Sequence, residues 1–466
     1  MPRPGVPDRL RTGWAVAALL AGACATEPPP APPQMSGATV APLPSNVLGA
    51  VARVTVTGAD SVRARFRREG EAVDEVTPAV PAVAATEGIL LLGLHSEAAY
   101  AVRVEAFGPG GRAEGAALPR VTGALPAVLP VIRTVGTDPS PGYVAFASGM
   151  YGLVIDNGGR IVWYHRFPNG PGLNFMPLPN GRWAARPAPA VSGQAPRWVQ
   201  VDPDGRVLDA VGCADGFIAR PHDLVREADG SWWLLCDEVR TLDLSPHGGR
   251  PDARVTGTAI QHIGADGTVR FRGSAFDHLD ITELPAAQRN GETVNWTHGN
   301  ALTRDGGGIL VSFRNLDQVV RIDTGTGQVT WRLGGTGNSF MIEGVEGRPF
   351  AGQHGVRIDA AGRLLLFDNV GKAGDSRVER YVLDPARGVA RLEASWGLAP
   401  SVEGTLAGSV QELPGGRVLA AFGSGGRVVE FGPDGQPAWW IEGSLGFVFR
   451  AQRVLSLYAP GVGLAR

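Results

Sequence analysis

Six turns that end in glycine recur between residue 139 and the end of the chain, and their spacing limits the possible folds. The turns are Asp156–Gly159, Asp202–Gly205, Ala265–Gly267, Asp323–Gly327, Asp384–Gly388 and Pro433–Gly435. Consecutive final glycines are 46 to 62 residues apart, which is about the length of one four-stranded propeller blade. The repeat therefore predicts a six-bladed β-propeller, in which each of these turns joins two outer strands of a blade.

A second set of glycine turns falls between the first set and predicts an inner hairpin in most blades. These turns are Pro179–Gly181, Ala228–Gly230, Gly306–Gly308, Ala360–Gly362 and Pro414–Gly416. With 66 glycines and 37 prolines in 466 residues, the composition suits short strands and tight turns without reaching low complexity. Aromatic residues follow several outer turns, and we interpret them as packing between blades: Trp163, Phe271, Trp331, Trp396 and Trp439.

Residues 37–135 lack this repeat and predict a smaller, separate β domain. Short alternating segments such as Val51–Val56 are separated by glycine and proline turns. Leu94 and Tyr100 resemble the tyrosine corner of fibronectin type III domains. The predicted fold class is therefore all-β, with a small fibronectin- or Ig-like β-sandwich followed by a six-bladed β-propeller over residues 136–466.

The first residues of the chain predict export. Three arginines precede the apolar run Trp14–Ala23, which is too short to span a bilayer and is typical of a secretory signal. We expect residues 1–24 to be a signal peptide of lipoprotein type, with Cys24 as the lipid anchor and residues 25–36 as a proline-rich linker. Cleavage after Ala23 without lipidation is the alternative. The expected location is periplasmic or on the outer membrane, and only the lipid anchor would contact a membrane.

The remaining cysteines and the charge balance give further expectations. Cys213 and Cys236 lie in a chain predicted to be exported, so they can form a disulfide or simply be small buried residues. Lys and Arg number 43 against 45 Asp and Glu, and a formal charge of -2 excludes the basic surface that nucleic acid binding requires. No sequence feature supports a homodimer, and no cofactor is expected.

Three of the eight histidines occupy equivalent positions in successive repeats. His222, His298 and His354 precede the inner-turn glycine of their repeats by 8, 10 and 8 residues. In a propeller the strand before that turn lines the central channel, so the three imidazoles should converge at one of its mouths. Arg314 lies six residues beyond the inner turn and returns toward the same mouth. Asn300, two residues after His298, shares its side if the segment is extended.

This group of side chains favours an anion site. Imidazoles, a guanidinium and an amide donate hydrogen bonds that suit a tetrahedral oxyanion such as sulfate or phosphate. A Zn²⁺ or Fe²⁺ centre is the alternative, because three imidazoles can bind either metal. Arg314 disfavours it, since a guanidinium repels a dication. We interpret Asp223 as holding its loop, and Asp277–Asp280 as a solvated loop or a lid over the mouth.

Four motifs carry a resemblance to a known family: Pro221–Asp223, Trp296–Asn300, Ser312–Gln318 and Gln353–Gly355. Over residues 130–466 the chain resembles the bacterial arylsulfate sulfotransferases, which work without a nucleotide sulfate donor. That family has the same architecture, a small β-sandwich before a six-bladed propeller. The resemblance implies an aryl sulfate donor, a phenolic acceptor and a ping-pong reaction.

The resemblance also implies roles for individual residues. His354 would carry the sulfuryl group as a transient sulfohistidine, while His222, His298, Asn300 and Arg314 would bind sulfate oxygens. The spacing of the histidines alone does not say which imidazole attacks. A phosphoryl transferase, a non-catalytic cell-surface propeller that binds a sulfated or phosphorylated ligand, and a propeller with a His-ligated metal remain alternatives.

Overall fold

The computed structural model describes residues 30–189 and 191–462, so Cys24 and the predicted signal peptide lie outside the described residues. This part of the chain is all-β: it contains β-strands and short 3₁₀-helices but no α-helix. None of its helices has the length and apolarity that a membrane crossing requires. The 3₁₀-helices are η1 (Ala82–Ala84), η2 (Ser245–His247), η3 (Ala275–Asp277), η4 (Ile281–Glu283), η5 (Ala286–Gln288), η6 (Arg314–Leu316) and η7 (Pro414–Gly416).

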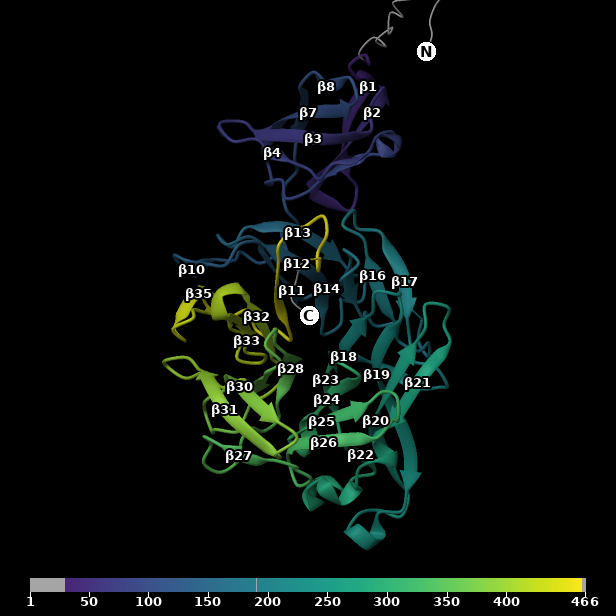
Figure 1. The fold of residues 1–466 in the computed structure, drawn as a ribbon, viewed down its shortest axis with the longest axis vertical. Helices are drawn as coiled ribbons and strands as arrows, with labels where there is room; N and C mark the ends of the chain where they lie inside the picture. Colours follow the sequence, from purple (N-terminus) through teal and green to yellow (C-terminus); the bar gives the residue numbers. More distant parts are fainter. Residues whose placement is uncertain (1–29, 190, 463–466) are drawn as a thin grey trace, which may run out of the picture.

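The N-terminal part forms two antiparallel sheets around one hydrophobic cluster, at one end of the molecule (Figure 1). The first sheet contains β1 (Gln34–Leu43), β2 (Asn46–Thr57) and β6 (Ile89–Leu91). The second contains β3 (Ser61–Arg68), β4 (Glu75–Val76), β5 (Val80–Pro81), β7 (Ala99–Gly108), β8 (Gly111–Glu114) and β9 (Leu118–Val121). The Tyr100 hydroxyl accepts the backbone N–H of His95, as a tyrosine corner requires.

The rest of the described chain forms six further sheets, which we number I to VI. Sheet I contains β11 (Tyr143–Ser148), β12 (Tyr151–Ile155), β13 (Ile161–Arg166) and β36 (Ala451–Val454). Sheet II contains β14 (Phe175–Pro177), β15 (Trp183–Ala185), β16 (Trp198–Val201) and β17 (Val207–Val211). Sheet III contains β18 (Ile218–Arg226), β19 (Trp232–Leu242), β20 (Ala253–Ile263), β21 (Val269–Ser274) and β22 (Thr293–Asn295).

The remaining three sheets follow in chain order. Sheet IV contains β23 (Gly299–Asp305), β24 (Gly308–Phe313), β25 (Gln318–Asp323) and β26 (Val329–Gly334). Sheet V contains β27 (Met341–Glu343), β28 (His354–Ile358), β29 (Leu364–Asp368), β30 (Arg377–Asp384) and β31 (Val389–Trp396). Sheet VI contains β10 (Thr134–Gly136), β32 (Ser409–Leu413), β33 (Arg417–Ala421), β34 (Val428–Phe431) and β35 (Pro437–Ile441).

The two sets of glycine turns fall where the repeat predicts them. The six turns of the first set join the third and fourth strands of their sheets, counted from the innermost strand, as at Asp156–Gly159 between β12 and β13. In sheets V and VI a further strand, β27 or β10, lies outside this pair. The five turns of the second set join the innermost strand to the next one, as at Ala360–Gly362 between β28 and β29. Glycine suits these sites because Gly159 and Gly362 have φ angles of 83° and 79°, where a side chain is strained.

Hydrophobic clusters join each of these sheets to the next and close them into a ring. Separate clusters of buried side chains lie between sheets I and II, II and III, III and IV, IV and V, V and VI, and VI and I. The innermost strands β14, β36, β32, β28, β23 and β18 are neighbours in that order. The inner strands therefore surround a common axis.

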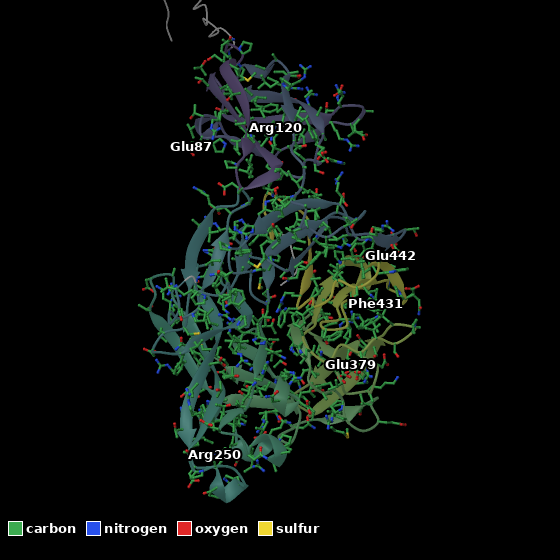
Figure 2. All side chains as sticks on the ribbon, turned by 180° about the vertical axis from the view of Figure 1, so that it is seen from behind. Glu87, Arg120, Arg250, Glu379, Phe431 and Glu442 are labelled. Atoms are coloured by element: carbon green, nitrogen blue, oxygen red, sulfur yellow. A yellow bond between two sulfur atoms is a disulfide. The ribbon has the colours of Figure 1, made fainter. Side chains whose placement is uncertain are left out.

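A disulfide and the N-terminal sheets complete the packing. Cys213 and Cys236 form a disulfide, so the first of the two alternatives for these cysteines holds. The N-terminal sheets rest on sheets I and II, where the Ser45 hydroxyl donates to the Asp204 carbonyl oxygen and the Asn46 amide donates to that of Tyr164. Figure 2 shows Glu87 in the N-terminal part and Arg250 at the opposite end of the molecule.

Candidate functional site

The three equivalent histidines lie on three neighbouring inner strands, at places where strand pairing is irregular. His222 lies within β18, His298 immediately precedes β23, and His354 is the first residue of β28. The pairing of each of these strands with the next one shifts register beside the histidine. Such bulges re-aim side chains and are common beside active sites. The irregularities therefore let neighbouring strands direct their imidazoles toward one place.

The backbone of His298 adopts an uncommon conformation, held in place by its neighbours. Its φ angle is 51°, in the left-handed region that costs a residue with a side chain about 1 kcal/mol or more. The Thr258 hydroxyl accepts the N–H of Gly299 at 2.7 Å, and the Arg314 N–H donates to the His298 carbonyl oxygen at 3.2 Å. A Cβ at Gly299 would lie 2.5 Å from the Thr258 methyl group, so this approach requires glycine.

Four of the predicted site residues line one cavity of about 430 Å³: His222, His298, His354 and Arg314. The centroids of the His222 and His298 rings are 5.1 Å apart. The Phe449 ring lies between two of the imidazoles, at 5.5 Å from the ring of His222 and 6.1 Å from that of His354. The structure thus brings the three imidazoles and one guanidinium together.

Arg314 reaches the cavity from a 3₁₀ turn and not from a strand. The strand β24 ends at Phe313, and Arg314 begins η6. Backbone hydrogen bonds from Arg314 and Asn315 to the carbonyl groups of His298 and Thr297 hold this turn against the His298 segment. The expected return of the arginine toward His298 is therefore observed, although its local structure is different.

Asn300 is not brought to the cavity. Its side chain is completely buried and donates to the Gln353 carbonyl oxygen at 2.8 Å, while its own Oδ1 atom has no hydrogen-bond partner. Asn300 would share the side of His298 only in an extended segment, and the positive φ of His298 together with the register shift after Gly299 breaks that alternation. Its role as a sulfate-binding residue stays a prediction.

The hydrogen bonds of His354 assign its tautomer. The Nδ1 atom lies 2.9 Å from the Gly352 carbonyl oxygen and 2.9 Å from the Asn369 Oδ1 atom. Both partners can only accept, so Nδ1 carries the proton and donates. In the neutral ring the lone pair is then on Nε2.

The other two imidazoles have the opposite arrangement. The Arg220 guanidinium donates from Nε to Nδ1 of His222 at 3.4 Å, and the Asn295 amide donates to Nδ1 of His298 at 2.7 Å. A ring nitrogen that accepts a hydrogen bond is unprotonated, so the protons of these neutral rings are on Nε2. The site therefore contains one imidazole with a free Nε2 lone pair and two with Nε2–H donors.

Burial keeps all three imidazoles neutral at pH 7. Desolvation lowers the pKa of His354 to about 4 against the opposing effect of its Nδ1 acceptors, and lowers the pKa of His298 to about 3 with help from the charge of Arg220. The pKa of His222 is also well below its ordinary value, again because of burial and then of Arg220. A neutral imidazole can act as a nucleophile, whereas an imidazolium cannot.

The structure adds residues that were not predicted from the sequence. Arg220 is buried, is ion-paired with Asp237 and touches His222. Its position two residues before His222 on one strand was an available signal, because alternate strand residues share a face. An apolar wall borders the cavity and includes Leu406 and Phe447, which are 50% and 47% exposed. Only a structure could reveal this wall, because its members come from distant loops.

A second cavity of about 600 Å³ lies at the opposite ends of the same inner strands and contains none of the eight histidines. Asp223 lies between His222, which lines the first cavity, and Leu224, which lines the second. It is completely buried and pairs with Arg357 and Arg450. In the part of the chain that the structure describes, no three His, Cys, Asp or Glu side chains are grouped so that they could hold a metal ion. Asp277 ends η3 and Asp280 caps η4, outside the residues that line either cavity.

Comparisons with known proteins give one family and several distant structural similarities. The chain is 11% identical to streptogramin B lyase, with a TM-score of 0.37, over 66% of this chain and 87% of the lyase. It is 12% identical to a chain of a nidogen–laminin complex, with a TM-score of 0.37, over 66% of this chain and 97% of the other. It is 12% identical to a luciferin-regenerating enzyme, with a TM-score of 0.35, over 67% of this chain and 95% of that enzyme. Similarities at this level say nothing of activity.

No curated protein matches the sequence. Residues 215–444 match the family model described as Arylsulfotransferase (ASST), and this range includes His222, His298, Arg314 and His354. The region of residues 215–444 therefore belongs to the arylsulfotransferase family.

Proposed function

We propose that this protein transfers a sulfuryl group from an aryl sulfate ester to a phenolic acceptor, in two steps through a sulfohistidine on His354. Family membership supports a sulfotransferase enzyme. One observation carries the choice of residue: His354 is neutral and Nδ1-protonated, and it shares a cavity with two imidazoles that donate from Nε2 and with the Arg314 guanidinium. A receptor for an anion needs donors but has no use for a free nucleophile.

In the first step the Nε2 lone pair of His354 forms a bond to sulfur as the bond from sulfur to the aryl oxygen breaks. The electron pair of the broken bond leaves with the phenolate, which then takes a proton from solvent. Charge on the sulfuryl oxygens is met by Arg314 and by the Nε2–H groups of His222 and His298, which are already oriented before reaction. No nucleotide is required, because the aryl sulfate already carries a good leaving group.

In the second step a phenol oxygen attacks sulfur and the N–S bond breaks, which returns the lone pair to Nε2. The phenol proton passes to solvent water, because the Nε2 atoms of His222 and His298 already carry protons and their Nδ1 atoms already accept hydrogen bonds. The apolar wall with Leu406, Phe447 and Phe449 supports an aryl group on both substrates. Asn300 stays in the proposal as a predicted sulfate-binding residue, and its amide donates to the carbonyl oxygen of Gln353, the residue before the nucleophile.

We also propose that sheets I to VI are the blades of a six-bladed β-propeller over residues 136–466, and that residues 37–135 are an Ig-like β-sandwich. The six inter-sheet clusters and the hydrogen bond of Tyr100 support this. Export with a lipid anchor at Cys24 remains part of the proposal. The Cys213–Cys236 disulfide supports it, since disulfides persist in oxidising compartments.

The decisive measurement is the release of 4-nitrophenol from 4-nitrophenyl sulfate, with and without added phenol, for the wild type and for His354→Ala. We expect release that depends on phenol and is lost in the variant. Mass spectrometry of the protein after donor alone should find one sulfuryl group on a peptide that contains His354. His165→Ala is the matched control, because His165 is buried outside the cavity.

Three outcomes would overturn the proposal. No release with any of several phenols would favour a non-catalytic binding protein. Release from 4-nitrophenyl phosphate but not from the sulfate would favour phosphoryl transfer. Release that survives His354→Ala but is abolished by a chelator would assign the site to a metal.

A further inference from the structure

Among the side chains that the structure describes, Asn369 is the one that hydrogen-bonds to the proposed nucleophile, and it does so from outside the cavity lining. It directly follows β29, its side chain is completely buried, and its Oδ1 atom lies 2.9 Å from Nδ1 of His354. It does not line the cavity itself, so it acts there only through the residues that it contacts, which are His354 and the loop of Gly404 and Ala407.

The orientation of the Asn369 amide is determined by its other contacts. Its Nδ2 atom donates to the Gly404 carbonyl oxygen at 2.5 Å and to the Ala407 carbonyl oxygen at 2.6 Å. If the amide were reversed, its oxygen would face two carbonyl oxygens, and two buried acceptors would lose their donor. The amide oxygen must therefore face His354, and Nδ1 of His354 must carry the proton.

We infer that Asn369 is a positioning residue that keeps the proton on Nδ1 of His354 in both steps of the reaction. This inference rests on the proposed function for its chemical meaning. With the proton on Nδ1, the lone pair available for sulfur is on Nε2. After transfer the same proton lets the ring leave as neutral imidazole when the N–S bond breaks. Without it the leaving group would be the far more basic imidazolate.

A neutral amide suits this role better than a carboxylate. A carboxylate at position 369 would stabilise the imidazolium, raise the pKa of His354 and protonate Nε2 in the resting enzyme. The other charged and titratable groups around His354 are Arg314, His222 and His298 on the cavity side. On the loop side Asp317 and Asp368 accept the amides of Gly352 and Ala351, and so are engaged with the backbone.

The test is the tautomer of His354 in full-length protein labelled with ¹⁵N-histidine, read from imidazole nitrogen shifts and assigned with His354→Ala. We expect the Nδ1–H form in the wild type and a measurable share of the Nε2–H form in Asn369→Ala, because only the Gly352 carbonyl oxygen then accepts from Nδ1. In that variant kcat for sulfuryl transfer should fall about tenfold or more, as the loss of a buried hydrogen bond would give. The KM for the donor should change much less, because Asn369 does not touch it.

Ser376→Ala is the matched control. The Ser376 hydroxyl donates to the Asn369 carbonyl oxygen and accepts the Gly404 N–H, so it ties the same two segments without touching His354. The control should lose stability but keep the Nδ1–H form and most of kcat. Equal loss of kcat in both variants, at equal loss of stability, would overturn the inference in favour of a purely structural role.

A third variant gives a readout that structural damage would not produce. In Asn369→Asp the acid limb of the pH profile of kcat/KM should move to higher pH, because a carboxylate raises the pKa of His354; an unmoved limb would count against the inference. If the variants do not fold, the wild-type spectrum still decides, because an Nε2–H form of His354 would overturn it. No sulfuryl transfer by a wild type with the Nδ1–H form would instead defeat the proposed function alone.

Discussion

At pH 7 the positive charge beside the cavity comes from guanidinium groups, because burial keeps the three imidazoles neutral. Arg314 lines the cavity, and Arg220 lies behind His222 with part of its charge offset by Asp237. An anion is therefore attracted by groups that do not titrate near neutrality. The imidazoles are left to donate from Nε2 or, in His354, to attack.

This arrangement predicts an unusual pH dependence. The pKa of His354 is lowered to about 4, so its neutral form persists above that value and is lost as the pH falls through it. We expect kcat/KM for the aryl sulfate to be flat from about pH 8 to pH 6 and to fall only toward pH 4. Initial rates of 4-nitrophenol release, with folding checked by tryptophan fluorescence, measure this. An acid limb near the ordinary histidine pKa would contradict the assignment.

Substitution of Arg314 tests the electrostatic contribution of one residue. If Arg314 acts like a single oxyanion donor, Arg314→Ala should raise the barrier by about 2 to 4 kcal/mol, which is about 30- to 1000-fold in kcat/KM. Arg314→Lys keeps the charge but loses the planar fork, so it should recover part of the loss. Steady-state kinetics of both variants decide. Full activity in Arg314→Ala would remove this residue from the mechanism.

At the residue scale the sequence predicted the histidines but not their chemistry. Similar spacings of 8, 10 and 8 residues from the inner turns predicted that His222, His298 and His354 converge, because equivalent positions in repeats meet at one axis. Which ring is nucleophilic depends on hydrogen bonds donated by Arg220 and Asn295 and on one accepted by Asn369, and no spacing rule gives these. The orientation of Asn300 was not predictable, since it depends on the positive φ of the preceding segment.

At the scale of single elements, the inner strands combine regular pairing with one break, which lies at the first residues of β23 and β28 and within β18. Beyond the histidines the strands β18, β23 and β28 pair regularly with their neighbours. The glycine turns were predictable because these positions have a positive φ angle, which favours glycine. The bulges were not, since the same residues can be read as an uninterrupted strand. The end of β24 at Phe313 was not predicted for the same reason, because the sequence can be read as a strand that continues through Arg314.

Sheet V contains two buried carboxylates that share one arginine, and this predicts a pH-dependent stability. Glu379, labelled in Figure 2, and Asp368 are both completely buried and both contact Arg377. Burial, and then the charge of Asp368, raises the pKa of Glu379 to about 7. The folded state therefore holds a proton that the unfolded state releases near pH 4.5, so stability falls as the pH rises from about 4.5 to 7.

Glu379→Gln mimics the protonated acid and should remove this loss. We expect the free energy of unfolding of the variant to exceed that of the wild type by up to about 3 kcal/mol at pH 8, with a much smaller difference at pH 5. Urea unfolding at both pH values measures it. Glu393→Gln, on the neighbouring strand β31 and partly exposed, is the control and should show no such trend. A difference that does not grow with pH would contradict the buried, protonated state.

At the scale of the whole molecule, the six sheets are held together by apolar contacts. Where the first and last sheets meet, each also contains a strand from the other end of the repeat region. The period of the turns predicted the number of repeats. It did not predict that the last sheet takes β10 from the N-terminal side while the first takes β36 from the C-terminal side. The reason is that β10 and β36 lie before and after the repeated turns. Closure therefore joins segments more than 300 residues apart.

A single carboxylate links four of these sheets through the centre, and its removal tests whether the ring behaves as one unit. Asp223 of sheet III accepts the Leu302 amide of sheet IV and pairs with Arg357 of sheet V, at 3.1 and 2.8 Å. It also pairs with Arg450, which immediately precedes β36 of sheet I. Asp223→Ala would leave the buried guanidinium of Arg450 and the partly buried one of Arg357 without their carboxylate, a loss of about 3 to 5 kcal/mol.

Which sheets lose stability in Asp223→Ala distinguishes a carboxylate that links several sheets from one that stabilises only its own loop. We expect faster amide hydrogen exchange in the inner strands of sheets I, III, IV and V together, because all four share the carboxylate. Asp359→Asn is the control: Asp359 is also buried, but it bonds within one turn of sheet V, so its effect should stay in that sheet. Urea unfolding and hydrogen exchange of both variants measure this. If exchange rises only in sheet III, Asp223 holds its own loop and the ring is stabilised by the apolar clusters between sheets.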